Sequence, residues 1–161
     1  MNPIVEILVI LFSTAIVIPI LGKLSKTLRN VAIFAGIAWA SVLFLGLYGR
    51  TISLSWSLMG FQLTWHTNML SWFFGSIVMG LAFLIVPFTF TYLWNYERQD
   101  YFYFAFVMTI ASMMGILFSA DFLSLFFFWE IMTWSSFLNV IYYRYEAQKA
   151  GLKYFVMSVI G

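Results

Sequence analysis

Five apolar stretches, each long enough to cross the hydrocarbon core of a bilayer as a helix, constrain this chain more than any other feature. They cover residues 4–21, 31–48, 68–94, 101–118 and 122–143. Only 9% of the 161 residues are charged and 63% are apolar, whereas about a quarter of a soluble domain is charged. We therefore predict an all-α polytopic membrane protein in which residues 1–161 form a single transmembrane domain.

Residues 50–66 follow a different pattern, because apolar and polar side chains alternate on both sides of Gly60. A period of two around a glycine predicts a short β-hairpin at the membrane face, between the second and third spans. Trp56 and Trp65 suit the membrane interface. His66, at the end of the hairpin, is expected to be a hydrogen-bonded interfacial residue, with a role in a proton relay as the alternative.

A sixth helix is predicted over residues 152–161, after a charged loop at 144–151. Its ten residues would rise only about 15 Å, which is half of a hydrocarbon core. The chain is therefore expected to be either the front portion of a longer polypeptide or a subunit whose last helix is completed by neighbouring protein.

The basic residues are distributed unevenly over the connections between the spans. The connections 22–30, 95–100 and 144–153 alternate onto one side and hold seven of the eight Lys and Arg residues, and Arg50 lies on the other side. The positive-inside rule then predicts a protein of the cell (plasma) membrane with the basic loops in the cytoplasm. The N-terminus and the hairpin are predicted to lie outside.

Composition also limits the cofactors that the chain can hold. It has no cysteine, which excludes disulfides and thiolate ligation, and its single histidine and lack of an acidic cluster argue against a metal or haem site. The net charge of +2 comes without a basic patch of the kind that binds nucleic acid. We expect no cofactor, no metal and no nucleic-acid partner.

Glu130 is the candidate functional residue, because it lies near the middle of the predicted span 122–143. A charged side chain at that depth costs about 2.5–3.5 kcal/mol on insertion scales. No Lys or Arg within the first five spans is placed to pair with Glu130, so its carboxyl group is expected to be neutral there. An approaching cation would favour the carboxylate and release the proton, which would make Glu130 a switchable proton relay. The alternative is a neutral Glu130 that is hydrogen-bonded to a neighbouring helix and only stabilises packing.

Three other charged residues have simpler interpretations. Lys153, in the first turn of the sixth helix, is either a cytoplasmic anchor or a second ion-translocation residue reached through water. Asp121 stands where the N-cap of the fifth span is expected. Glu6 lies within the first turns of the first span, where the helix dipole favours an acid.

Two segments carry a resemblance to a known family. Residues 126–138 read Phe-Phe-Phe-Trp-Glu-Ile-Met-Thr-Trp-Ser-Ser-Phe-Leu, and residues 150–161 begin Ala-Gly-Leu-Lys-Tyr-Phe. These resemble the fifth and sixth helices of the antiporter-like subunits of respiratory complex I. Mrp-type cation/proton antiporters and energy-converting membrane-bound hydrogenases belong to the same family. The resemblance covers the N-terminal portion of that family's fold.

The resemblance implies roles for individual residues. Glu130 matches the fifth-helix glutamate, which pairs with a lysine on the seventh helix of the family fold, and Lys153 matches the sixth-helix lysine. The family fold has about fourteen helices with inverted repeats that each form a half-channel. The later family lysines and histidine have no counterpart here, so the resemblance implies that this polypeptide alone does not form a complete ion path.

Together these inferences predict a truncated or split antiporter-like subunit of a membrane-bound respiratory or hydrogenase-type complex. It would contribute to proton or sodium translocation coupled to electron transfer, with no redox chemistry in the chain itself. The expected partners are other membrane subunits, including another antiporter-like subunit or the remainder of the fold, and the lipid bilayer. The alternatives are a non-conducting structural subunit that bridges its neighbours and a module that binds lipid or quinone.

Overall fold

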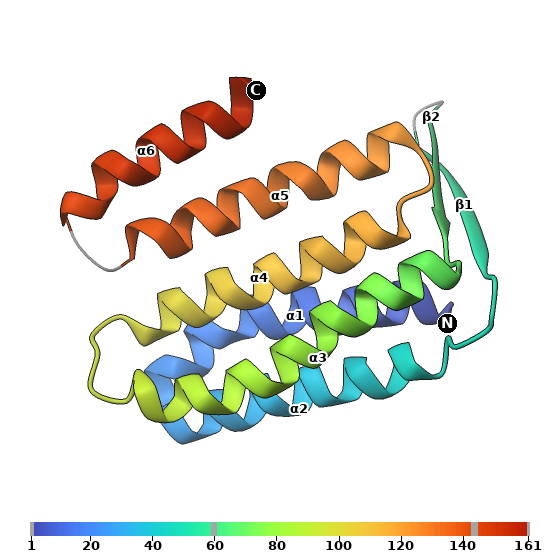
Figure 1. Ribbon diagram of the computed structural model, residues 1–161. Helices are drawn as coiled ribbons and strands as arrows, with labels where there is room; N and C mark the ends of the chain where they lie inside the picture. The colour runs from blue at the N-terminus through green and yellow to red at the C-terminus, as the bar shows by residue number, and fades with distance from the viewer. Residues whose placement is uncertain (1, 59–60, 143–144, 161) are drawn as a thin grey trace.

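The computed structural model describes residues 2–58, 61–142 and 145–160, and Figure 1 shows their arrangement. The elements are α1 (Pro3–Leu24), α2 (Lys26–Leu45), β1 (Ser53–Leu58), β2 (Phe61–His66), α3 (Met69–Tyr92), α4 (Gln99–Phe118), α5 (Phe122–Ile141) and α6 (Tyr145–Ile160). The helices α1 to α5 are long and apolar enough to cross a membrane. The predicted fold class, a polytopic helical membrane protein with a small hairpin between the second and third spans, is confirmed.

The helices are arranged in layers around α4. In Figure 1, α6 lies over α5 and α5 lies over α4, while α1, α2 and α3 complete the bundle on the other side of α4. Half of the spanning residues of α4 are buried, compared with 22–33% in the other four spans. Its buried side chains include Tyr103, Val107, Met114 and Phe118. Because lipid is as apolar as these side chains, close packing rather than hydrophobic burial holds such a layer together.

The first connection is much shorter than the predicted loop 22–30. Ser25 alone separates α1 from α2, and most of the expected loop is helical. Lysine, arginine and leucine are good helix formers, so a charged segment next to an apolar span can extend it. The second span also ends earlier than residue 48, since Gly46 is the C-cap of α2. The bounds of α3, α4 and α5 differ from the predicted ones by about two residues, within the usual uncertainty of helix ends.

The start of the sixth helix is likewise earlier than predicted. The charged segment 144–151 was expected to be a loop, but α6 already begins at Tyr145. Long charged side chains such as Lys149, which is exposed, can lie on a helix at a membrane end and keep their charges in water. The connection between α5 and α6 contains residues 143–144, which lie outside the described residues.

The hairpin is fastened to the start of α5 by one aspartate. Asp121 is the N-cap of α5, as predicted, and accepts hydrogen bonds from the backbone N–H and the hydroxyl group of Ser124, at 2.8 and 2.6 Å. The same carboxylate accepts a 2.6 Å bond from the backbone N–H of Thr64 in β2. The carbonyl of Thr64 in turn accepts from the N–H of Ala120 at 2.9 Å. The hairpin is therefore tied to the α4–α5 connection, with its turn at residues 59–60 outside the described part of the chain.

The pKa of Asp121 reflects this hydrogen bonding. Burial would raise the pKa, but the bonds from Ser124 and Thr64 favour the carboxylate and lower it below the ordinary value of an aspartate. Because the pKa is lower in the folded state, the contact contributes its full stabilisation at pH values above the pKa of the unfolded state, which is about 4. The contribution is lost as the pH falls through the folded pKa, so the contact should not change with pH between about 5 and 8.

Substitution of Asp121 by asparagine should loosen the hairpin while preserving the start of α5. Asparagine is as good an N-cap as aspartate, but it loses the charge-assisted bond from the Thr64 N–H. We expect amide exchange in β1 and β2 to become about 5–30-fold faster, equivalent to about 1–2 kcal/mol, as measured by hydrogen–deuterium exchange. Asp121→Ala is the comparison, because alanine removes the N-cap as well and should therefore also accelerate amide exchange in the first turn of α5. Unchanged exchange of the hairpin in both variants would contradict this role of Asp121.

Candidate functional site

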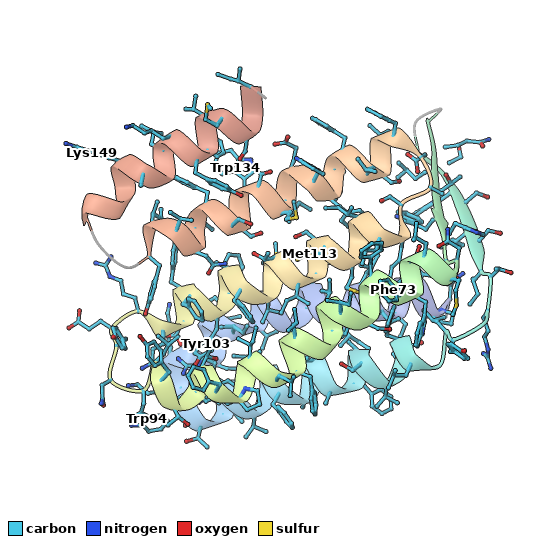
Figure 2. The ribbon with its side chains drawn as sticks, in the orientation of Figure 1. Phe73, Trp94, Tyr103, Met113, Trp134 and Lys149 are labelled. Atoms are coloured by element: carbon cyan, nitrogen blue, oxygen red, sulfur yellow. The ribbon has the colours of Figure 1, made fainter. Side chains whose placement is uncertain are left out.

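Glu130 lies near the middle of α5 and is partly buried. Residues three, four, seven and eleven positions apart share one face of a helix, so Glu130 lies in line with Trp134, Phe137 and Ile141. The rings of Trp134 and Phe137 both contact Phe155 of α6, with ring centroids 4.5 and 5.2 Å apart. Figure 2 shows Trp134 in the layer between α5 and α6. Glu130 therefore occupies the face of α5 that turns toward α6.

The end of α6 approaches the level of Glu130. The two helices run antiparallel, and a Cβ atom on Gly151 would lie 2.5 Å from a methyl carbon of Ile141, so the helices are in close contact near their connection. Gly151, Phe155 and Ser158 lie on one face of α6, at helical spacing. Continuing the antiparallel pairing by one turn beyond Phe155 brings Ser158 to about the level of Trp134, one turn before Glu130. Glu130 thus lies near the end of the described part of α6, on the side of α5 that is turned away from the α4 core.

Within the described residues, the carboxyl group of Glu130 makes no hydrogen bond and no ion pair. The alternative was that Glu130 only stabilises packing through a hydrogen bond to a Ser, Thr or carbonyl of a neighbouring helix. The described residues show no such hydrogen bond. The same residues contain no group of three His, Asp or Glu side chains that could hold a metal ion. The chemistry open to Glu130 is therefore exchange of a proton, or pairing with a cation from outside the described residues.

Lys153 does not share the site with Glu130. It is exposed and lies two residues from both Gly151 and Phe155, on the side of α6 that is turned away from α5. The structure places Lys153 nearer the basic end of the bundle, where a lysine can extend toward the headgroups. The two residues that the sequence grouped as ion-translocation candidates are thus on different helix faces.

A polar seam lies on the other side of α5, against α4. The hydroxyl group of Thr109 donates to the Ser135 hydroxyl oxygen at 3.1 Å and accepts from the Asn139 amide at 3.4 Å. The Asn139 side-chain oxygen is buried without a partner among the described residues. The structure directs Ser135 and Asn139 toward α4, so these two side chains do not contribute to the environment of Glu130.

The structure reveals a second charged group that the sequence did not indicate. Arg29, only 1% exposed, pairs with Asp100 at 2.5 Å and donates to Asn30 and to Gln99, both at 2.8 Å. Its guanidinium group also lies over the ring of Tyr103, 4.7 Å from the centroid. We call these five residues the Arg29 cluster. It joins α2 to α4 at the basic end of the bundle, close to Tyr103 in Figure 2.

The Arg29 cluster also includes a close approach of α1. A Cβ atom on Gly22 would lie within 2.5 Å of both carboxylate oxygens of Asp100, so only glycine leaves room for this carboxylate. Among the described residues, the guanidinium group of Arg29 donates to Asn30, Gln99 and Asp100, and Asp100 neutralises its charge. The cluster is therefore a structural connection of three helices. Its sequence signal was weak, because Arg29 and Asp100 are 71 residues apart.

Comparison with known proteins supports the family predicted from residues 126–138. No family model matches the chain. Over 151 residues it is 27% identical to the Na(+)/H(+) antiporter subunit A1 of Staphylococcus haemolyticus and, to the same extent, to that of Staphylococcus aureus. These alignments cover 84% of this chain and 19% of each relative. The chain therefore spans about a fifth of the length of these relatives.

A solved structure agrees with the sequence comparison. The fold superposes with a TM-score of 0.85 and 25% identity on a chain of the membrane-bound sulfane sulfur reductase, an archaeal respiratory membrane complex. The match covers 98% of this chain and 25% of that chain. In sequence, the chain is thus similar to the Na(+)/H(+) antiporter subunit A1, and in fold it is similar to a chain of an archaeal respiratory membrane complex.

Proposed function

We propose that the chain acts as an antiporter-like subunit of a membrane-bound respiratory-type complex and that Glu130 takes part in proton or sodium translocation. The observation that carries this proposal is the position of Glu130. It is a mid-span acid on the α6-facing side of α5, with no hydrogen bond or ion pair among the described residues. An acid kept at that depth without an internal partner is most useful if an ion or a charged neighbour visits it.

The proposed role requires other subunits. Because the chain spans a fifth to a quarter of the proteins that it resembles, the cation that pairs with Glu130 is supplied by another polypeptide or by the rest of the fold. Large exposed rings on α5, including Phe122 at 86% and Phe127 at 60%, are available to neighbouring membrane subunits or lipid. Lys153 is retained in the proposal as a group near the cytoplasmic entrance.

Substitution of Glu130 by glutamine tests the proposal in the assembled complex. We expect ion translocation to fall at least tenfold, equivalent to about 1.4 kcal/mol, because glutamine has nearly the same shape but cannot exchange a proton. Glu6→Gln is the matched control, since Glu6 lies in the first turn of α1, and it should leave translocation unchanged. Ion flux in proteoliposomes and the amount of assembled complex should both be measured. Wild-type flux in the Glu130→Gln complex would refute the role of Glu130.

A structural role is the second candidate, supported by the extensive exposed apolar surface of α3 and α5. In that case the chain would bridge neighbouring subunits without conducting ions. Deletion of the chain would then disrupt assembly while Glu130→Gln had no effect on flux. Loss of flux in a fully assembled Glu130→Gln complex would exclude this alternative.

We further propose that the N-terminus and the hairpin lie outside the cell membrane and that the basic end of the bundle is cytoplasmic. Supporting this orientation, Lys23, Lys26, Arg98 and Lys149 belong to the end opposite to the hairpin. The chain has no cysteine, so the labelling of a single introduced cysteine reports the side of the membrane on which that residue lies. A membrane-impermeant maleimide should label Ser55→Cys in intact cells and Lys149→Cys only after permeabilisation. The reverse pattern would invert the proposed topology.

A further inference from the structure

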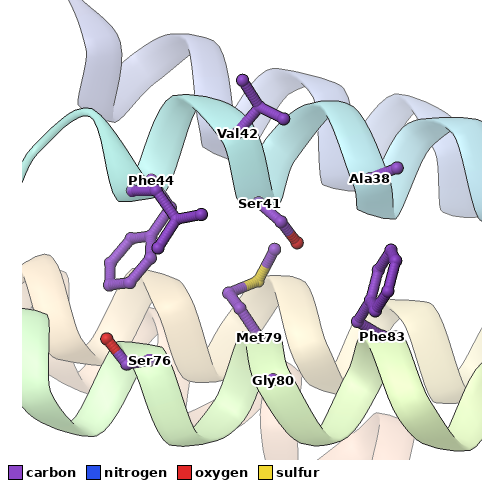
Figure 3. A pocket seen from close by; sticks show the side chains of 9 residues that line it. Ala38, Ser41, Val42, Phe44, Ser76, Met79, Gly80 and Phe83 are labelled. Carbon is purple, nitrogen blue, oxygen red and sulfur yellow. The ribbon is translucent and has the colours of Figure 1, made fainter.

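Two cavities adjoin each other along the surface between α2 and α3. The first, seen in Figure 3, has a volume of about 460 Å³ and is lined by residues that include Ser41, Ser76 and Gly80. The second has a volume of about 630 Å³ and extends toward the basic end, past Pro87 to Trp94. We call the two cavities together the α2–α3 groove. Each volume lies in the range of small-molecule sites.

The chemistry of the first cavity suits a hydrocarbon chain. Its two hydroxyl groups are already bonded within their own helices, Ser41 to the carbonyl of Ile37 at 2.8 Å and Ser76 to that of Trp72 at 2.7 Å. Gly80 leaves its floor open, because a Cβ atom there would meet nothing within 4 Å. A polar ring, such as that of a quinone, would find no free donor here. The cavity therefore offers mainly methylene and aromatic surface.

The groove is too narrow for a helix but not for an acyl chain. The rings of Phe34 on α2 and Phe83 on α3 are in contact, with centroids 5.4 Å apart, and stand between the two cavities. Both rings are partly exposed, so the path from one cavity to the other runs over their outer edges. A helix is about 10 Å wide with its side chains and does not fit into so narrow a groove, whereas a flexible acyl chain crosses the ring edges by rotating its single bonds.

The basic end of the groove suits a phosphate. Lys26 is exposed, and its ammonium group donates to the carbonyl of Trp94 at 3.3 Å and lies 5.6 Å from the centre of that indole ring. Trp94 itself lines the second cavity, so the positive charge is at its rim. Lys26 makes no ion pair within the described residues. It is also the first residue of α2, whose cap residue Ser25 makes no side-chain bond to the free N–H groups.

From this arrangement we propose that the α2–α3 groove holds one anionic glycerophospholipid. Its acyl chain lies between α2 and α3, and its phosphate is held by Lys26 and by the start of α2. Charge complementarity supports this occupant, because an uncompensated ammonium group and the positive end of a helix dipole adjoin an apolar channel. Basic pockets between spanning helices select anionic headgroups in the same manner. The lipid site is independent of the proposed role of Glu130, which lies on the other side of the bundle.

Photolabelling of the purified complex tests the site. The probes are phosphatidylglycerol and phosphatidylcholine that carry the same diazirine-labelled acyl chain, and the labelled peptides are located by mass spectrometry. In the wild-type complex we expect labels on α2 and α3 residues of the groove, with phosphatidylglycerol favoured about fivefold, the effect of about one lysine at a membrane surface. Lys26→Gln should abolish this preference. Lys23→Gln, an exposed lysine of α1 that does not line the groove, should preserve it.

A second pair of variants tests the acyl-chain site itself. Gly80→Phe fills the first cavity without a backbone clash, and it should reduce labelling with both probes severalfold. Leu81→Phe adds a ring to the neighbouring, exposed position and should leave labelling unchanged. Equal labelling by the two probes in the wild-type complex, or undiminished labelling in Gly80→Phe, would overturn the proposal. So would a benzoylphenylalanine at Val42 that crosslinks to a neighbouring polypeptide instead of lipid.

Discussion

Replacement of Arg29 by methionine is expected to lower the free energy of unfolding by about 3 kcal/mol. The substitution keeps the length of the side chain but leaves the Asp100 carboxylate without its cation and two amide oxygens, those of Asn30 and Gln99, without their donor. This is the lower end of the cost of breaking a buried pair, because Asp100 keeps 35% of its side chain exposed. Thermal unfolding of the purified complex in detergent measures the loss.

Asp100→Asn and the double variant separate charge from packing. Asp100→Asn leaves a guanidinium group that is 2% exposed and cannot lose its proton, so we expect a loss at least as large as that of Arg29→Met. In the double variant both charges are gone, and the total loss should be smaller than the sum of the two single losses by about 1–3 kcal/mol. Additive losses would mean that the two side chains stabilise the bundle independently of each other.

Replacement of Gly115 by leucine is expected to cost about 3 kcal/mol, the upper end for overpacking. Gly115 lies on α4 where α5 comes closest, and a Cβ atom there would lie 2.3–2.6 Å from three ring carbons of Phe128. Phe128 is 6% exposed and its ring stacks on Phe12, so it cannot move aside easily. Separation of α4 from α5 would also displace Glu130, which is two residues further along α5. Both the unfolding temperature and ion flux should therefore decrease.

Gly80 provides the matched control for Gly115. It also lies within a spanning helix, but a Cβ atom at Gly80 would meet nothing within 4 Å. Gly80→Ala should therefore be neutral or stabilise the protein by up to about 1 kcal/mol through helix propensity alone. Equal unfolding temperatures for Gly115→Leu and Gly80→Ala would show that the contact between Gly115 and Phe128 does not limit helix packing.

The spans and the hairpin could be predicted because each has a local signal. An unbroken apolar run predicts a spanning helix, and alternation around Gly60 predicts paired strands. The N-cap role of Asp121 is local in the same sense, since it depends on a bond to Ser124 three residues away. Its second role, holding Thr64 of β2, could not be seen, because it joins residues 57 positions apart.

The same distinction explains what the sequence missed at the two charged sites. Arg29 lies in a segment with two lysines and so was assigned to a solvated loop, whereas Asp100 and Gln99 make its burial possible from α4. For Glu130, the sequence predicts that it lies on a helix and near the middle of that span, and helical spacing predicts which residues share its face of α5. The separation of Lys153 from Glu130 could not be predicted in this way, because it depends on how α6 is rotated against α5.

Interactions at the two ends of α4 fix its position in the bundle. Its first turn is bonded to α2 through Asp100 and packs closely against α1 at Gly22, and the connection after its last turn is bonded to the hairpin through Ala120 and Thr64. α4 is therefore held in place at both ends, since tilting it would break a buried ion pair at one end or a backbone hydrogen bond at the other. In the proposed role of Glu130, we therefore expect any movement that accompanies ion passage to occur in the outer layer formed by α5 and α6.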